Sequence, residues 1–371
     1  MPDRDRPARR PEPPAFGSSE PFLVGLEEEL LLVEASGERL APVAAQVLEA
    51  LQAPSGLAGH EAYAAEIELR SVPRASAVRA ATQVGELRAA ARAAGTELMG
   101  AGVHPTSPWG VADLVQLARY RDVERTMRGL IRRTPECALH VHVALPDPEA
   151  AISAYNGLRE HLPLLVALAG NSPWWFGNDS GLASARHAQV RAYPRRGVPP
   201  ALRDFDHYLE LIDAVMRAGG LPDYTFVWWD VRPHPRLGTV EVREMDSQSR
   251  LVDVAALAAL IQGLARHEAE RRSAPRAPAE AIDESCFRAA RDGLQAVVET
   301  PEGPLPVPAA ARRALGLAGA ALRGAGEEEA LDGIERILRE GAGADRQRAA
   351  HAQGGVGALL RQLVAETAAP L

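Results

Sequence analysis

Lysine is absent from this chain of 371 residues, and its 41 basic residues are all arginines. The absence excludes three kinds of site. A Walker-type phosphate loop and a protein-kinase site each need a lysine that contacts ATP phosphates, and Schiff-base chemistry needs a lysine amine. If this protein handles phosphates, it must do so with arginines and divalent cations.

Cysteines are few and long apolar runs are missing. Cys137 and Cys286 are the only two cysteines, so no disulfide framework is expected and a cytoplasmic location fits. No stretch of about 18 apolar residues is free of charges or helix breakers, so no membrane span is expected. The net charge of −8 argues against a general nucleic-acid binder. Residues 1–20 lack the apolar segment of a signal peptide and are expected to form a disordered tail.

Residues 22–33 are predicted to form a strand with carboxylates in its middle. Alternation places Glu27 and Glu29 on one face and Glu28 on the other. Carboxylates among aliphatic residues are costly unless something compensates them, and a divalent cation relieves their mutual repulsion. The alternative is a helix with solvated glutamates. The aliphatic residues on both flanks favour the strand.

Two further predicted strands also carry polar residues at alternate positions. In residues 65–73, alternation places Glu66, Glu68 and Arg70 on one face, and in residues 137–145 it pairs His140 with His142. Two histidines at this spacing in an aliphatic strand indicate contact with a metal or phosphate. The alternative for each histidine is a structural role in the core.

Residues 228–243 are predicted to form a hairpin around a Pro- and Gly-containing turn. Asp230 shares a face with Arg232 on its first strand. Thr239, Glu241 and Arg243 share a face on the second. Charges of both signs on otherwise apolar strands predict a cavity. An exposed face with cross-strand ion pairs is the alternative.

Apolar periodicity and breaker residues predict the remaining elements. Helices are expected over residues 41–51, 78–99, 114–131, 148–169, 204–218 and 252–269, and a short strand over 103–105. The aromatic loop 171–181 is expected to be a packed plug or a pocket wall. Residues 21–270 are expected to form the core. Residues 271–371 are expected to add helices that pack outside it or at a subunit contact.

Seven segments between residues 22 and 270 together resemble the glutamate–cysteine ligase type 2 family of ATP-dependent carboxylate–amine ligases. In order they read VGLEEELLLV, IELRSVP, GVHP, CALHVHVALPD, GNSPWWFGNDSGLASAR, YPRRGVPP and VWWDVRPHPRLGTVEVREMDSQ. No single segment is specific, but the combination is. The resemblance implies an α+β fold with a glutamine-synthetase-like core, in which a curved, mainly antiparallel sheet forms a funnel with helices outside.

The resemblance also implies roles for individual residues. The expected magnesium ligands are Glu27, Glu29, Glu68, His140 and Glu241. Glu66 remains the alternative to Glu68, because the second strand runs one residue longer to its proline than is common. The expected catalytic residues are Arg243, Arg232 and Glu241. The expected nucleotide contacts are His142, Arg186 and Arg243.

Amide formation is the activity that this resemblance implies, with ATP and Mg²⁺ as cofactors and Mn²⁺ as a possible substitute. A carboxylate does not react with an amine at neutral pH, because its leaving group would be oxide. Conversion to an acyl phosphate by ATP solves this problem. The expected substrates are a small-molecule carboxylate, with glutamate preferred, and an amine, which would give a γ-glutamyl bond. A homo-oligomer is possible.

Two alternatives of other classes stay open. One is a metal-dependent amidohydrolase-type enzyme that uses the His-x-His strand without ATP. The other is a non-catalytic, ligase-like binding protein.

Overall fold

A computed structural model describes residues 14–110, 113–272 and 275–371. Its centre is a seven-stranded sheet in the order β2-β3-β1-β5-β9-β8, with β4 also paired to β1, and these pairings are antiparallel. The strands are β1 (Val24–Val33), β2 (Ala58–His60), β3 (Glu66–Arg70), β4 (Glu97–Met99), β5 (Ala138–Ala144), β8 (Val231–His234) and β9 (Thr239–Asp246). The predicted α+β class and the mainly antiparallel sheet are confirmed.

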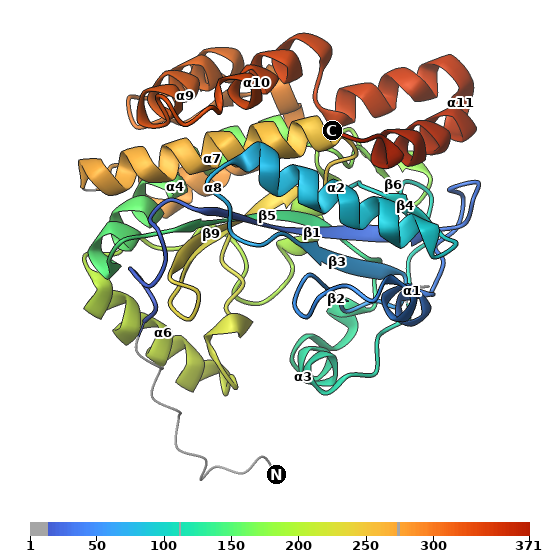
Figure 1. The fold of residues 1–371 in the computed structure, drawn as a ribbon, viewed down its shortest axis with the longest axis horizontal. Coiled ribbons are helices and arrows are strands. Elements are labelled where there is room, and N and C mark those ends of the chain that lie inside the picture. The colour runs from blue at the N-terminus through green and yellow to red at the C-terminus, as the bar shows by residue number, and fades with distance from the viewer. Residues whose placement is uncertain (1–13, 111–112, 273–274) are drawn as a thin grey trace.

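Helices cover one face of this sheet in two layers (Figure 1). The inner layer contains α2 (Ala77–Ala93), α4 (Pro148–Ala169) and α7 (Leu251–Arg271). α4 and α7 are buried along most of their length, because they lie between the sheet and further helices. These further helices are α8 (Ala279–Asp292), α9 (Val307–Ala321) and α10 (Glu328–Glu340), whereas α11 (Gly343–Ala368) packs against β4 and α2.

Several predicted elements are confirmed closely. The helix predicted over residues 148–169 is α4, which begins after the capping side chain of Asp147 and ends before Gly170. The predicted helices at 41–51, 204–218 and 252–269 correspond to α1 (Ala44–Leu51), α6 (Phe205–Gly219) and α7. Residues 22–33 contain β1 and not a helix, and the predicted hairpin is β8 and β9.

Three predictions are wrong in part. The helix predicted over 78–99 stops at Ala93, because the chain turns at Gly95 (φ 98°) and residues Glu97–Met99 pair with β1 as β4. The helix predicted over 114–131 is shorter, with α3 (Ala118–Met127) followed by a 3₁₀ turn, Arg128–Ile131. The short strand predicted at 103–105 is reduced to a single bridge between Val103 and Glu136.

The predicted N-terminal tail is ordered where it is described. Residues 1–13 lie outside the described residues. Beyond them, the Ala15 N–H donates to the Pro235 carbonyl at 2.8 Å and the Gly17 N–H donates to the Leu145 carbonyl at 3.0 Å. The prediction of disorder up to residue 20 is therefore wrong for this part. No helix among the described residues combines the length and the apolar composition that a membrane crossing requires.

The boundary predicted between the core and the C-terminal region at residue 270 stays a prediction. The packing of the C-terminal helices on the core can be tested where α7 and α9 approach each other closely. A Cβ atom at Gly263 of α7 would lie 2.6 Å from Cβ and 2.7 Å from Cα of Ala318 in α9. Gly263→Ala should therefore cost about 1–3 kcal/mol of stability, because the α9 backbone must move. The matched change Gly316→Ala, on the open side of α9, meets no atom within 4 Å and should stabilise by about 0.5–1 kcal/mol. Chemical unfolding of both variants tests this. Equal stability of the two would contradict the packing.

Candidate active site

A cavity of about 430 Å³ opens on the sheet face that the helical layers leave uncovered. Strands β1, β3, β5, β8 and β9 contribute charged side chains to its lining. Those predicted from the sequence as site residues are Glu27, Glu29, Glu68, His140, Arg186, Arg232 and Arg243. The strand-face prediction of a cavity at this position is thus realised, and side chains more than 200 residues apart in the sequence meet there.

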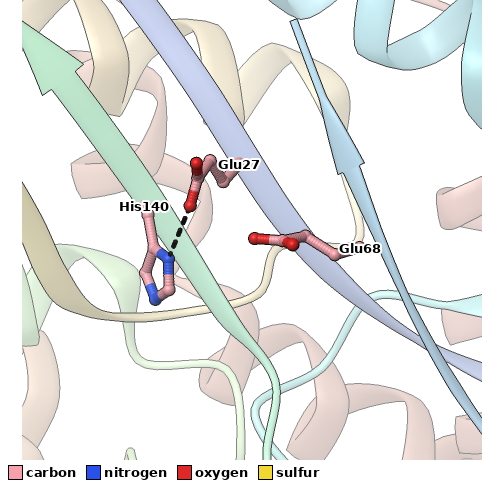
Figure 2. A group of neighbouring side chains, drawn as sticks. All are labelled: Glu27, Glu68 and His140. Atoms are coloured by element: carbon pink, nitrogen blue, oxygen red, sulfur yellow. Dashed lines mark ion pairs between the residues drawn. The ribbon is translucent and has the colours of Figure 1, made fainter. Parts of the chain in front are cut away.

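Strand register explains why the acidic residues meet. Glu27 lies opposite His140 of β5 on one side, and Glu29 lies opposite Glu68 of β3 on the other. His140 Nδ1 is 3.5 Å from Glu27 Oε2, and its Nε2 is 3.6 Å from Glu29 Oε1. Figure 2 shows Glu27, Glu68 and His140 turned toward one space between the three strands. Their ligand atoms all lie within 4.8 Å of one another, which suits a divalent cation.

A second group with the same spacing lies beside the first and shares Glu27. It contains Glu27, His142 and Glu241. His142 Nδ1 contacts the Thr239 hydroxyl at 3.0 Å, which orients the ring, while Nε2 lies 3.6 Å from Glu27 and 3.8 Å from Glu241. The buried atoms His140 Nδ1 and His142 Nε2 have no hydrogen-bond partner among the described residues. Unpartnered imidazole nitrogens facing carboxylates at these distances fit a metal site.

Glu241 is fully buried between the guanidiniums of Arg232 and Arg243. These two arginines line the cavity, whereas the predicted site residues Glu241 and His142 lie behind its lining. Arg232 donates through Nε to Glu241 Oε2 at 2.6 Å, and Arg243 pairs with the other carboxylate oxygen. Burial alone would raise the pKa of the Glu241 carboxyl, but Arg232 and Arg243 hold it well below its usual range. The group is therefore ionised, and removing it would leave Arg232 and Arg243 without their acidic partner.

Arg186 is placed by a buried polar network that involves the loop 171–181 and the residues after it. Ser172 and Ser184 donate to Asp246 at 2.7 and 2.9 Å, and the Arg186 N–H donates to the Ser172 hydroxyl. The Arg186 guanidinium donates to the Glu244 carbonyl at 3.0 Å, and its Nε has no partner among the described residues. This leaves a buried donor beside the cavity for an anionic ligand.

The aromatic residues of the same loop lie elsewhere. Trp174 and Trp175 form β6 (Trp174–Trp175) of a two-stranded hairpin, and Trp174 packs at 4.2 Å between ring centroids against His351 of α11. In the described part of the chain, none of the loop aromatics lines the cavity. Trp174 is buried and Trp175 and Phe176 are half-buried, which fits a packed plug better than a pocket wall.

Several cavity residues are absent from the predicted site. Glu66, which was the alternative to Glu68, lines the cavity together with it, and the further lining residues include Glu61, Arg70, Glu136, Tyr193 and Arg196. Burial and the neighbouring Glu29 carboxylate raise the pKa of Glu61 from 4.5 to about 8 and that of Glu66 well above its usual range. The sequence signals for these residues were the positions of Glu66 and Arg70 on one strand face and the segment YPRRGVPP, which contains Tyr193 and Arg196.

Asp230 does not share the environment of Arg232 as the alternation suggested. It precedes β8, accepts the Gly197 N–H at 3.1 Å and lies 3.3 Å from Arg196, which also donates to Glu244 at 2.6 Å. Asp230 and Glu244 thus hold the Arg196 guanidinium at the cavity wall.

Relatives of known sequence cover nearly the whole chain. A putative glutamate–cysteine ligase 2-3 of Rubrobacter xylanophilus is 40% identical over 92% of this chain and 95% of its own length. A glutamate–cysteine ligase of Haloquadratum walsbyi is 31% identical over 95% of this chain and 99% of its own length.

Solved structures share the fold. A glutamate–cysteine ligase of Francisella tularensis in complex with AMP matches with a TM-score of 0.69 at 13% identity, covering 94% of this chain and 89% of that chain. A bifunctional glutathione synthetase of Pasteurella multocida matches with a TM-score of 0.65 at 16% identity, over 93% of this chain and 52% of that chain. The family model described as glutamate–cysteine ligase family 2 matches residues 23–365. With this match and these relatives, the chain belongs to glutamate–cysteine ligase family 2.

Proposed function

We propose that this family member is an ATP- and Mg²⁺-dependent carboxylate–amine ligase that forms an amide through an acyl phosphate. Glutamate is the preferred acid, so a γ-glutamyl amide is the expected product. The observation that carries the proposal is a cavity lined by the metal-suited group Glu27, Glu68 and His140 and by the guanidiniums of Arg186, Arg196, Arg232 and Arg243. A second metal-suited group, which shares Glu27, lies beside it. The cytoplasmic location and the possible homo-oligomer stay predictions.

The proposed reaction has two balanced steps. A carboxylate oxygen of the acid attacks the γ-phosphorus of ATP and forms the acyl phosphate. The bond between the γ-phosphorus and the oxygen that bridges it to the β-phosphate breaks, and ADP leaves with that oxygen. The amine then attacks the acyl carbon and expels inorganic phosphate, and the amine proton passes to solvent. The protein's contribution is to hold several negative charges in line while they react.

The residues in and beside the cavity would divide this task between them. Glu27, Glu68 and His140 would hold one cation, and Glu27, His142 and Glu241 a second. Magnesium bound there would supply positive charge to the phosphate oxygens. Arg232 and Arg243 would grip a phosphate or the substrate carboxylate with planar, always charged forks, which replace the absent lysine. Arg186 has an unpartnered donor for the nucleotide or the acid.

The alternatives are less well supported. A metal-dependent amidohydrolase needs a metal ion with an open coordination position, but it does not need several arginines around that ion. A non-catalytic binder has no use for carboxylates such as Glu61 and Glu66, whose pKa values are raised by burial and by neighbouring carboxylates, because each weakens the metal-free fold. Both alternatives predict that ADP is not released in the presence of an acid and an amine.

Chelation provides the first test. ADP release with glutamate and a panel of amines should need millimolar Mg²⁺ or Mn²⁺, because magnesium that bridges nucleotide phosphates is held weakly by protein alone. Excess EDTA should abolish the release, and added Mg²⁺ should restore it. Undiminished ADP release in EDTA would refute the metal-dependent mechanism.

Two substitutions separate metal binding from phosphate binding. Glu241→Gln should raise the magnesium requirement and lower turnover by roughly 10²–10³-fold, because it removes a ligand charge. It should also cost about 3 kcal/mol of stability, since Arg232 and Arg243 lose their buried partner. Arg243→Lys keeps the charge but loses the fork, so it should lower turnover without changing the magnesium requirement. Turnover measured against magnesium concentration, with a melting curve for each variant, tests both. Wild-type activity in both would contradict the site.

Stability should depend on pH through the crowded carboxylates. Between the ordinary pKa of Glu61, 4.5, and its value of about 8 in the folded, metal-free protein, the folded state keeps a proton that the unfolded state has lost. Stability therefore falls as pH rises through this window. Glu61→Gln should flatten the fall and raise Tm at about pH 8 by a few degrees, whereas Glu34→Gln on the surface should not. An unchanged slope in Glu61→Gln would show that Glu61 is not protonated there.

A further inference from the structure

Arg88 of α2 is among the largest fully buried side chains, and every nitrogen of its guanidinium is used. Nε donates to Glu28 Oε2 at 2.8 Å, and Nη2 pairs with the other oxygen of the same carboxylate. The remaining donors reach three main-chain carbonyls: Gln248 at 2.7 Å, Ser249 at 2.9 Å and Thr367 at 3.3 Å. One side chain thus joins β1, the segment after β9 and the last turn of α11.

Glu28 stands between Glu27 and Glu29 on β1, and it faces the helical layer while they face the cavity. Backbone alternation makes these three side chains one rigid unit, because a rotation of the strand that moves Glu28 must also swing its neighbours. A metal site tolerates only small displacements of its ligand atoms. The orientation of Glu28 therefore bears directly on the geometry of Glu27.

The last turn of α11 is itself fixed to this junction. The Thr367 hydroxyl accepts the Gly100 N–H at 2.9 Å, and Glu366 accepts from the Ser249 hydroxyl at 2.5 Å and from Arg250 at 2.9 Å. The Thr367 carbonyl, which accepts a hydrogen bond from Arg88, is consequently held in place from two sides. Arg88 is thus a polar link between the last turn of α11 and the back of β1, in addition to the apolar cluster that α11 forms with Leu31 and Val33.

We propose that Arg88 is a positioning residue for the metal-binding carboxylates of β1, and that the last turn of α11 holds it in place. The proposal rests on the proposed function. An apolar pair in place of Arg88 and Glu28 would fill the same space with equal or greater stability. It would not fix the rotation of the strand, as the guanidinium does by pairing with both oxygens of the Glu28 carboxylate and donating to three carbonyls. In this proposal, α11 helps to orient the metal-binding carboxylates on the opposite face of the sheet by holding Arg88.

Metal binding without nucleotide tests this inference independently of activity. Free Mn²⁺ is measured by electron paramagnetic resonance during titration of wild type, Glu28→Gln, Arg88→Lys and a control. The control is Glu268→Gln, a second buried glutamate, which lies 3.5 Å from His161 between α4 and α7. We expect Glu28→Gln and Arg88→Lys to bind Mn²⁺ about 10-fold more weakly, as for other residues that orient ligands. Glu268→Gln should lower Tm yet bind like wild type.

Equal Mn²⁺ binding by all four proteins, whatever their melting temperatures, would overturn the proposal and leave Arg88 a purely structural residue. If Glu28→Gln and Arg88→Lys do not fold, Thr367→Ala decides, since it loosens the last turn of α11 without stranding a charge. It should bind Mn²⁺ more weakly than Glu268→Gln does, and equal binding would again overturn the inference. If the wild type releases no ADP from ATP with any acid and amine tested, the proposed function is refuted instead, while the Mn²⁺ comparison still stands.

Discussion

Crowded carboxylates on one face of β1 and β3 are the constraint on which the rest of this structure depends. Glu27, Glu29, Glu66 and Glu68 line one cavity together with Glu61. Such a group is stable only when opposite charge or protons compensate it. The folded chain uses both means: burial and crowding raise the pKa values of Glu61 and Glu66, and arginines line the remaining wall. A divalent cation is the partner that would replace the protons.

The fold holds this unfavourable arrangement by burying its other side. The sheet places β1 between β3 and β5, so that side chains from three strands converge. Behind it, α2, α4 and α7 pack a continuous aliphatic core, and α9 and α10 cover α7 in turn (Figure 1). The hydrophobic energy of this core is available to offset the electrostatic cost in front. Arg88 contacts β1 from the helical side through Glu28, whose neighbours Glu27 and Glu29 face the cavity.

Much of the site could be predicted from the sequence, because a period of two tells which strand residues share a face. That rule predicted the sides taken by Glu27, Glu28 and Glu29, and it placed His140 with His142. Residues that reach the cavity from outside the strands, such as Glu61 and Arg196, could not be found in this way. Their positions depend on how the chain returns to the sheet, and no local pattern records that.

The errors in the fold have a similar origin. The segment 78–99 has helical spacing throughout, yet its last residues pair with β1. After Gly95, backbone pairing with the neighbouring strand outweighed the local preference for a helix. The tail up to residue 20 looked disordered by composition, although Ala15 and Gly17 find backbone partners at the ends of strands. In both cases a contact distant in sequence decided the outcome.

The central claim is that the protein forms an amide by transferring the γ-phosphoryl group of ATP to a carboxylate in this cavity. Transfer of an oxygen isotope from the carboxylate to phosphate tests it most directly. Glutamate labelled with oxygen-18 in its side-chain carboxylate is incubated with ATP, Mg²⁺ and an accepted amine, and the released phosphate is analysed by mass spectrometry. The account predicts that each phosphate carries one labelled oxygen, because the acyl-phosphate bridge oxygen leaves with it. Phosphate without label, formed together with the amide, would contradict the account.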